Sequence, residues 1–208
     1  MSFHLKWELL LACCFLTYAG EVRAPAATRR DVTELLQQLQ APETSDRAAA
    51  ELLKLAKGDV RVRRALAERL PGIIAKGPPN GPQRDAWANA ADLAGELKIK
   101  EACQALAKWM HTPAGPLGEE TELGIVTRLL GKPAAKALAE IGDPSLPFVA
   151  PVLSRGDDAE RWDAVYILNL IGSPAAKKLL RERVSSEPNP NLRGLIQRML
   201  GAERPSTE

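Results

Sequence analysis

Residues that could carry catalytic or metal-binding chemistry are few and far apart in this chain of 208 residues. His111 lies in a Pro/Gly-rich stretch, and the other histidine, His4, is close to the N-terminus. Cys13 and Cys14 are adjacent, and Cys103 stands alone in an apolar helical pattern that predicts a buried core residue, so no CxxC pair exists. Glycine-rich phosphate loops and GxSxG motifs are missing. We therefore predict no enzyme, no cofactor and no metal, and we expect His111 to be a solvated loop residue.

Aromatic residues in the segment 157–171 suggest non-covalent recognition instead. Trp162, Tyr166 and Asn169 are spaced i, i+4 and i+7, on a different side of the predicted helix from its apolar residues. Trp and Tyr bury a large area with few torsions to freeze, and they are common at binding hot spots. We predict that Trp162, Tyr166 and Asn169 bind a partner, with Asp163 and Trp87 as further candidates. The alternative is that Trp162 and Tyr166 pack against neighbouring helices.

The composition favours a globular, all-α chain. Hydrophobic residues make up 45% of the sequence, charged residues 26% and aromatic residues only 4%, while Ala and Leu dominate the periodic segments. The formal net charge is +2, with the two signs interspersed. Basic clusters at 61–64 and 177–183 are interrupted or flanked by acidic residues, and no aromatic residues alternate with them. This pattern disfavours a nucleic-acid partner.

Two short stretches repeat each other and predict how the helices are arranged. Ile141-Gly142-Asp143-Pro144 and Ile171-Gly172-Ser173-Pro174 each end one helical run and begin the next, 30 positions apart. Glycine can adopt the left-handed conformation at a helix C-terminus, Asp143 or Ser173 can cap the following helix, and proline suits its first turn. A fixed period of this length is typical of an α-solenoid of antiparallel helix pairs.

Helix starts and stops predict about five such pairs within residues 31–201. Asp31, Ser45 and Asp59 are candidate helix starts, and the helix after Asp59 should break at Pro71-Gly72. Further helices are expected at 86–97, 99–110, 121–130, 133–141, 145–154, 157–171, 174–184 and 191–200. Proline- and glycine-rich loops separate them at 76–82 and 111–118.

The stretch from Ala137 to Pro144, continued by Leu146-Pro147, Gly156-Asp157 and Arg161 to Ala164, resembles the HEAT repeat. It is similar in particular to the short HEAT-like repeats first described in phycobilin lyases. The resemblance is strong over 133–200 and weaker over 46–70 and 86–110. It implies that the second helix of each pair, including 157–171, lines a concave surface that binds a protein or peptide partner. The alternatives are a nucleic-acid-binding HEAT-like protein and a bilin-lyase-like protein that handles a chromophore.

Residues 1–24 have the parts of a secretory signal peptide. Lys6 precedes an apolar stretch from Leu9 to Leu16, and small or apolar residues flank a cleavage position after Ala24. The stretch is short for a membrane span. We predict cleavage near Ala24 and an exported (periplasmic or secreted) chain, with a linker at 25–30, the solenoid at 31–201 and a flexible tail at 202–208. The alternatives are a lipid anchor at Cys13, an uncleaved anchor, or a capping helix of a cytoplasmic protein.

Overall fold

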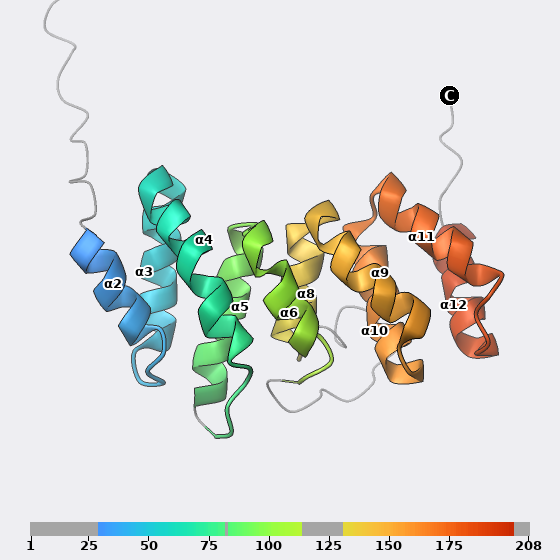
Figure 1. The fold of residues 1–208 in the computed structure, drawn as a ribbon, viewed down its shortest axis with the longest axis horizontal. Helices are drawn as coiled ribbons and strands as arrows, with labels where there is room; N and C mark the ends of the chain where they lie inside the picture. Colours follow the sequence, from blue (N-terminus) through green and yellow to red (C-terminus); the bar gives the residue numbers. More distant parts are fainter. Residues whose placement is uncertain (1–28, 82, 114–130, 202–208) are drawn as a thin grey trace, which may run out of the picture.

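The computed structural model describes residues 29–81, 83–113 and 131–201, and this part of the chain is helical throughout, with no strand (Figure 1). The helices are α2 (Arg29–Gln38), α3 (Ser45–Gly58), α4 (Val60–Ala75), α5 (Gln83–Glu96), η1 (Lys100–Ala102), α6 (Cys103–Trp109), α8 (Pro133–Ile141), η2 (Asp143–Ser145), α9 (Leu146–Arg155), α10 (Asp158–Ile171), α11 (Pro174–Val184) and α12 (Pro190–Gly201). The predicted all-α class is confirmed.

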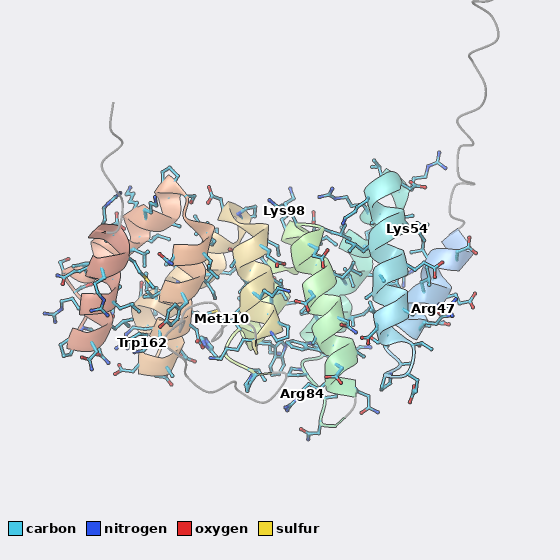
Figure 2. All side chains as sticks on the ribbon, turned by 180° about the vertical axis from the view of Figure 1, so that it is seen from behind. Arg47, Lys54, Arg84, Lys98, Met110 and Trp162 are labelled. Carbon is cyan, nitrogen blue, oxygen red and sulfur yellow. The ribbon has the colours of Figure 1, made fainter. Side chains whose placement is uncertain are left out.

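The helices form two layers. We call α2, α4, α6, α9 and α11 the A layer and α3, α5, α8, α10 and α12 the B layer, because within each layer every helix contacts the next. Figure 1 faces the A layer and Figure 2 faces the B layer. Among the described residues each A helix also packs against the B helix that follows it, which gives five pairs. The chain is therefore an α-solenoid, and α10 is the second helix of its pair, as predicted.

A single apolar core runs through all five pairs, from Val32 in α2 to Ile196 in α12. In α4, for example, Leu66, Leu70 and Ile74 are four residues apart and have no exposed area. Helices of this length are marginal alone in water, so each pair depends on the apolar faces of its neighbours. No helix of the described residues is long and apolar enough to cross a membrane.

The predicted turn at Gly172 and Ser173 is confirmed, and α10 also has a cap at its start. Asp157 and Glu160 form a capping box, in which the Asp157 carboxylate accepts from the Glu160 backbone N–H at 2.8 Å and the Glu160 carboxylate accepts from the Asp157 N–H at 2.9 Å. At the other end Gly172 is left-handed, with φ 62°. Ser173 then caps α11 by accepting from the Ala176 N–H at 3.1 Å.

The equivalent turn at Gly142 differs from the prediction. Gly142 has φ 84° and ψ −141°, which is outside the left-handed helical region, and Asp143 does not cap the next helix. The chain instead enters the 3-10 helix η2, where the Gly142 carbonyl accepts from both the N–H and the hydroxyl of Ser145, at 2.9 and 2.7 Å. The Ser145 N–H at the start of the next helix therefore has a partner without a carboxylate cap.

Three predicted boundaries were also wrong. α4 continues through Pro71 to Ala75, because Leu70 and Ile74 on either side of the proline are both fully buried. α2 begins at Arg29, which places Asp31 in its first turn rather than at its cap. The single helix expected after Lys98, over 99–110, is instead divided into η1 and α6. The predicted signal peptide, most of the linker, the helix 121–130 and the tail 202–208 lie outside the described residues.

Candidate functional site

Successive helices of the B layer are joined by polar side-chain contacts. Between α3 and α5, the Asn89 amide donates to the Ser45 hydroxyl at 2.9 Å and to the Asp46 carboxylate at 2.7 Å. Between α5 and α8, the Lys136 ammonium lies 3.1 Å from the Asp92 carboxylate. These contacts fix how each B helix sits on the next, in addition to the apolar core.

The next link, between α8 and α10, is buried. The Asp163 side chain is 1% exposed, and its Oδ2 accepts from the Lys132 ammonium at 2.6 Å. The same oxygen lies 3.0 Å from His111 Nδ1, in the turn after α6. His111 is therefore not a simple solvated loop residue, because it is hydrogen-bonded to a buried carboxylate. Asp163 joins three elements inside the molecule, and its exposed area is too small for direct contact with a partner.

The last link holds the C-terminal pair. Glu187, between α11 and α12, has no exposed side-chain area and accepts from two nitrogens of Arg161 at 3.2 Å and from Arg183 Nε at 2.8 Å. The Asn189 N–H also donates to this carboxylate at 2.9 Å. Arg161 in turn donates to the Gly156 carbonyl at 2.7 Å. One carboxylate therefore connects α10, α11 and the turn before α12.

Both buried carboxylates stay ionised more readily than ordinary ones. Burial by itself raises the pKa of Asp163, but the hydrogen bonds from His111 and Lys132 outweigh it and bring the pKa below its ordinary value. The pKa of Glu187 is lowered in the same way, because the Asn189 N–H, Arg183 and Arg161 more than offset the burial.

These lowered pKa values predict that the protein loses stability in acid. A carboxyl whose pKa is lower in the folded chain stabilises it above the unfolded pKa, and this contribution disappears as the pH falls through the folded pKa. We expect the free energy of unfolding, measured in urea, to fall steeply only below about pH 4. Asp163→Asn should be less stable at neutral pH and should lose less between pH 5 and pH 3 than the parent. An equal loss in both proteins would contradict the role of Asp163.

The five predicted partner-binding residues are buried to different degrees. The rings of Trp162 and Tyr166 are 6.0 Å apart at 34°, but Tyr166 is only 7% exposed, whereas Trp162 (labelled in Figure 2) and Asn169 are partly exposed. Trp87 is 4% exposed, and its indole N–H donates to the Ile74 carbonyl at 3.1 Å. Much of the predicted stripe therefore packs against neighbouring helices. α10 is enclosed on most of its circumference by α8, α9, α11 and α12.

Several residues of the two basic clusters are occupied by contacts within the chain. Arg63 donates to the Leu97 carbonyl at 2.6 Å, and Arg64 pairs with Glu68 at 3.3 Å. In α11, Lys178 lies 3.9 Å from Glu182. Arg63 keeps its charge because the Leu97 carbonyl is neutral, and the two ion pairs lie at the surface, where they offset only part of the charge of Arg64 and Lys178.

Two findings concern metal ligands and the free thiol in the part of the chain that the structure describes. No group of three or more His, Cys, Asp or Glu residues there could hold a metal ion. Cys103 is buried in the core as predicted, and burial raises the pKa of its thiol to about 11. A thiol with a pKa this high stays protonated at neutral pH.

The two stacked layers and their repeated turns define an α-helical repeat protein. Comparison with protein families finds that residues 132–201 match the family of HEAT repeats. This segment, which covers α8 to α12, consists of HEAT repeats within a longer helical solenoid. Comparisons with curated proteins and with solved structures gave no match.

Proposed function

We propose that this chain is a non-enzymatic scaffold that binds a protein or peptide partner across its B layer. The observation that carries the proposal is the row of α3, α5, α8, α10 and α12 (Figure 2), in which polar contacts connect successive helices. Stacked helical repeats generally use such extended, preorganised surfaces to bind partners. HEAT repeats in particular commonly mediate protein interactions and are typically not catalytic.

Trp162 and Asn169 are the contact residues that we propose on α10. Both retain partly exposed side chains on the B layer, whereas Trp87, Asp163 and Tyr166 are buried. An aromatic ring beside an amide offers apolar area and hydrogen bonds to a peptide backbone. Tyr166 packs beside the Trp162 ring, and in this proposal it supports that ring and does not contact the partner itself.

A pair of matched substitutions tests the B layer as the binding surface. Asn169→Arg places a bulky charge on α10, and Gln104→Arg makes an equivalent amide-to-arginine change at an exposed position of α6 in the A layer. Proteins crosslinked in cells to the parent chain and to each variant would be compared by quantitative mass spectrometry. We expect the crosslinked amount of a defined partner to be unchanged with Gln104→Arg. With Asn169→Arg its affinity should fall about tenfold, equivalent to roughly 1.4 kcal/mol of binding energy. Equal retention by both variants, at unchanged thermal midpoints, would contradict the proposal.

We further propose that the protein acts after export, with cleavage near Ala24. The proposal rests on the charged, apolar and small residues in the order typical of a signal peptide within 1–24. Intact mass and N-terminal sequencing of the protein from its native cells should find a mature chain that begins near Pro25. A lipid-modified Cys13, or an uncleaved N-terminus in the cytoplasmic fraction, would contradict it.

A further inference from the structure

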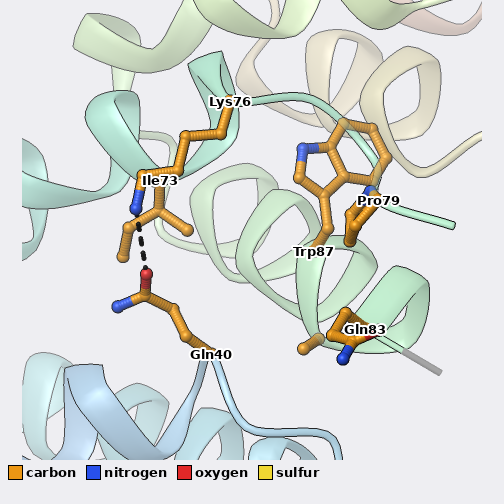
Figure 3. A pocket seen from close by; sticks show the side chains of 7 residues that line it. Gln40, Ile73, Lys76, Pro79, Gln83 and Trp87 are labelled. Carbon is orange, nitrogen blue, oxygen red and sulfur yellow. Dashed lines mark hydrogen bonds between the residues drawn. The ribbon is translucent and has the colours of Figure 1, made fainter. Parts of the chain in front are cut away.

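A small pocket opens between the end of α4, the loop after it, the start of α5 and Gln40 after α2 (Figure 3), and no residue of α10 lines it. Its volume is about 230 Å³. Ile73, Pro79 and Trp87 give it apolar walls, and Gln40, Lys76 and Gln83 place polar groups around it. The pocket therefore combines an apolar interior with a few polar groups, which is the usual make-up of a ligand site.

The walls of the pocket are held in place by contacts behind them. The indole N–H of Trp87 donates to the Ile74 carbonyl at 3.1 Å, which fixes the plane of the ring. The loop next to Lys76 packs on a second aromatic side chain, because Gly77, with φ 81°, lies so close to the Trp109 ring that a Cβ there would overlap it. The cavity is thus formed without a ligand, so little ordering free energy is lost on binding.

Lys76 gives the pocket a positive charge that is not neutralised by the described residues. Its ammonium donates to the Gln40 side-chain oxygen at 3.3 Å (Figure 3). The Gln40 amide nitrogen donates to the Leu36 carbonyl at 3.0 Å, which orients the amide oxygen toward the lysine. Gln40 is neutral, and no carboxylate lines the pocket. An anionic group beside Lys76 would therefore complement the site.

The size of the pocket limits what can enter. It is larger than the engineered apolar cavity of about 150 Å³ that binds benzene. It is smaller than the range of roughly 300–1,000 Å³ that is usual for drug-sized ligands. A single apolar side chain of the size of Phe or Leu fits a pocket of this volume. The pocket is open on one side, so the polypeptide that carries this side chain can extend out of it.

We propose that this pocket binds the C-terminal residue of a partner polypeptide. The apolar side chain of that residue lies between Trp87 and Ile73, and its α-carboxylate pairs with Lys76. The exposed Gln83 amide, at the mouth, is placed to hydrogen-bond the preceding peptide group. The site is distinct from the B-layer surface on α10, so either one can exist without the other.

Peptides that differ only at the C-terminus test the proposal. Fluorescently labelled Gly/Ser peptides ending in Phe, with a free carboxylate or with an amide, would be titrated with the full chain and followed by anisotropy. The carboxylate peptide should bind about tenfold more tightly than the amide, as expected for a hydrogen bond to a charged group. Binding should also shift the assigned indole N–H resonance of Trp87 but not that of Trp162. Equal affinity of the two peptides, or no binding by either, would overturn the proposal.

Substitutions of the lysine identify the site and its ligand class. Lys76→Met should lower the affinity for the carboxylate peptide about tenfold and leave the affinity for the amide peptide unchanged. Lys76→Arg should preserve the preference for the carboxylate peptide. Lys57→Met, at another exposed lysine, is the matched control and should have no effect. Equal losses in Lys57→Met and Lys76→Met would show non-specific charge attraction and overturn the proposal. Free 3-phenylpropionate should bind more weakly than the peptide, and equal affinity would replace a polypeptide with a small carboxylate as the ligand.

Discussion

Gly95→Val is expected to lower the free energy of unfolding by about 3 kcal/mol, the upper range for overpacking a core. Gly95 is buried in α5, where this helix meets α8. A Cβ at this position would lie 2.8 Å from the Ala137 Cα and would also overlap the Glu140 carboxylate. The backbone of α8 cannot rotate away as a side chain can, so the two helices must separate. Urea denaturation followed by circular dichroism measures the loss.

Gly72→Ala is the control for this effect. Gly72 is also inside a helix, α4, but nothing lies within 4 Å of a Cβ built there. Alanine should therefore stabilise α4 by about 0.5–1 kcal/mol through its better helix propensity. If Gly95→Ala stabilises the protein as much as Gly72→Ala does, the close approach of α5 and α8 is wrong.

In the Gly95→Val variant, the solenoid should unfold locally at the contact between α5 and α8. In a linear array the stability is a sum of pairs and of the interfaces between neighbours. Gly95→Val weakens one interface and leaves the others intact. We expect hydrogen exchange to show that α10 to α12 keep their protection while α5 and α8 lose theirs. Uniform loss of protection along the chain would show a single cooperative unit instead.

Helix boundaries set by local chemistry could be predicted from the sequence. α8 and α11 span Pro133–Ile141 and Pro174–Val184, as expected from a proline in the first turn and a glycine or polar residue after the last. The prediction failed where burial overrides local preference. Pro71 reads as a helix stop, but the buried positions on either side keep α4 intact. Gly95 lies inside an expected helix, where glycine is unfavourable, and only the neighbouring helix α8 reveals why it is needed.

The polar contacts of the B layer could not have been predicted. His111 and Asp163 are 52 positions apart, and Lys132 and Asp163 are 31 apart. The second separation is close to one repeat, but spacing alone does not say which side chains meet, because the stacking of helix pairs decides which residues face each other. From the sequence, Asp163 is therefore expected at the surface, and only the positions of Lys132 and His111 show that it is buried. Trp87 is predicted to bind a partner, but it is buried, with its ring forming a wall of the pocket and its N–H donating to the Ile74 carbonyl.

The carboxylate of Glu187 should matter most for the C-terminal helix pair. Glu187→Ala is expected to lower the free energy of unfolding by about 3 kcal/mol, because removing one partner of a buried ion pair leaves the other uncompensated. Arg161, whose side chain is only 9% exposed, would lose two of its hydrogen bonds, and Arg183 would lose another. Urea denaturation measures the change. Glu68→Ala, which breaks an exposed pair with Arg64, is the control and should cost no more than about 0.5 kcal/mol.

The position of Glu187 near the end of the array predicts where the damage appears. Its bonds connect α10 and α11 with the turn before α12, so Glu187→Ala should expose the amides of α11 and α12 to hydrogen exchange while α3, α4 and α5 keep their protection. Replacing both members of the pair, as Arg161→Met with Glu187→Leu, should cost less than the sum of the single changes, because neither charge is then left buried alone. Additive costs, or equal loss of protection in α3 and α12, would contradict a local role for this carboxylate.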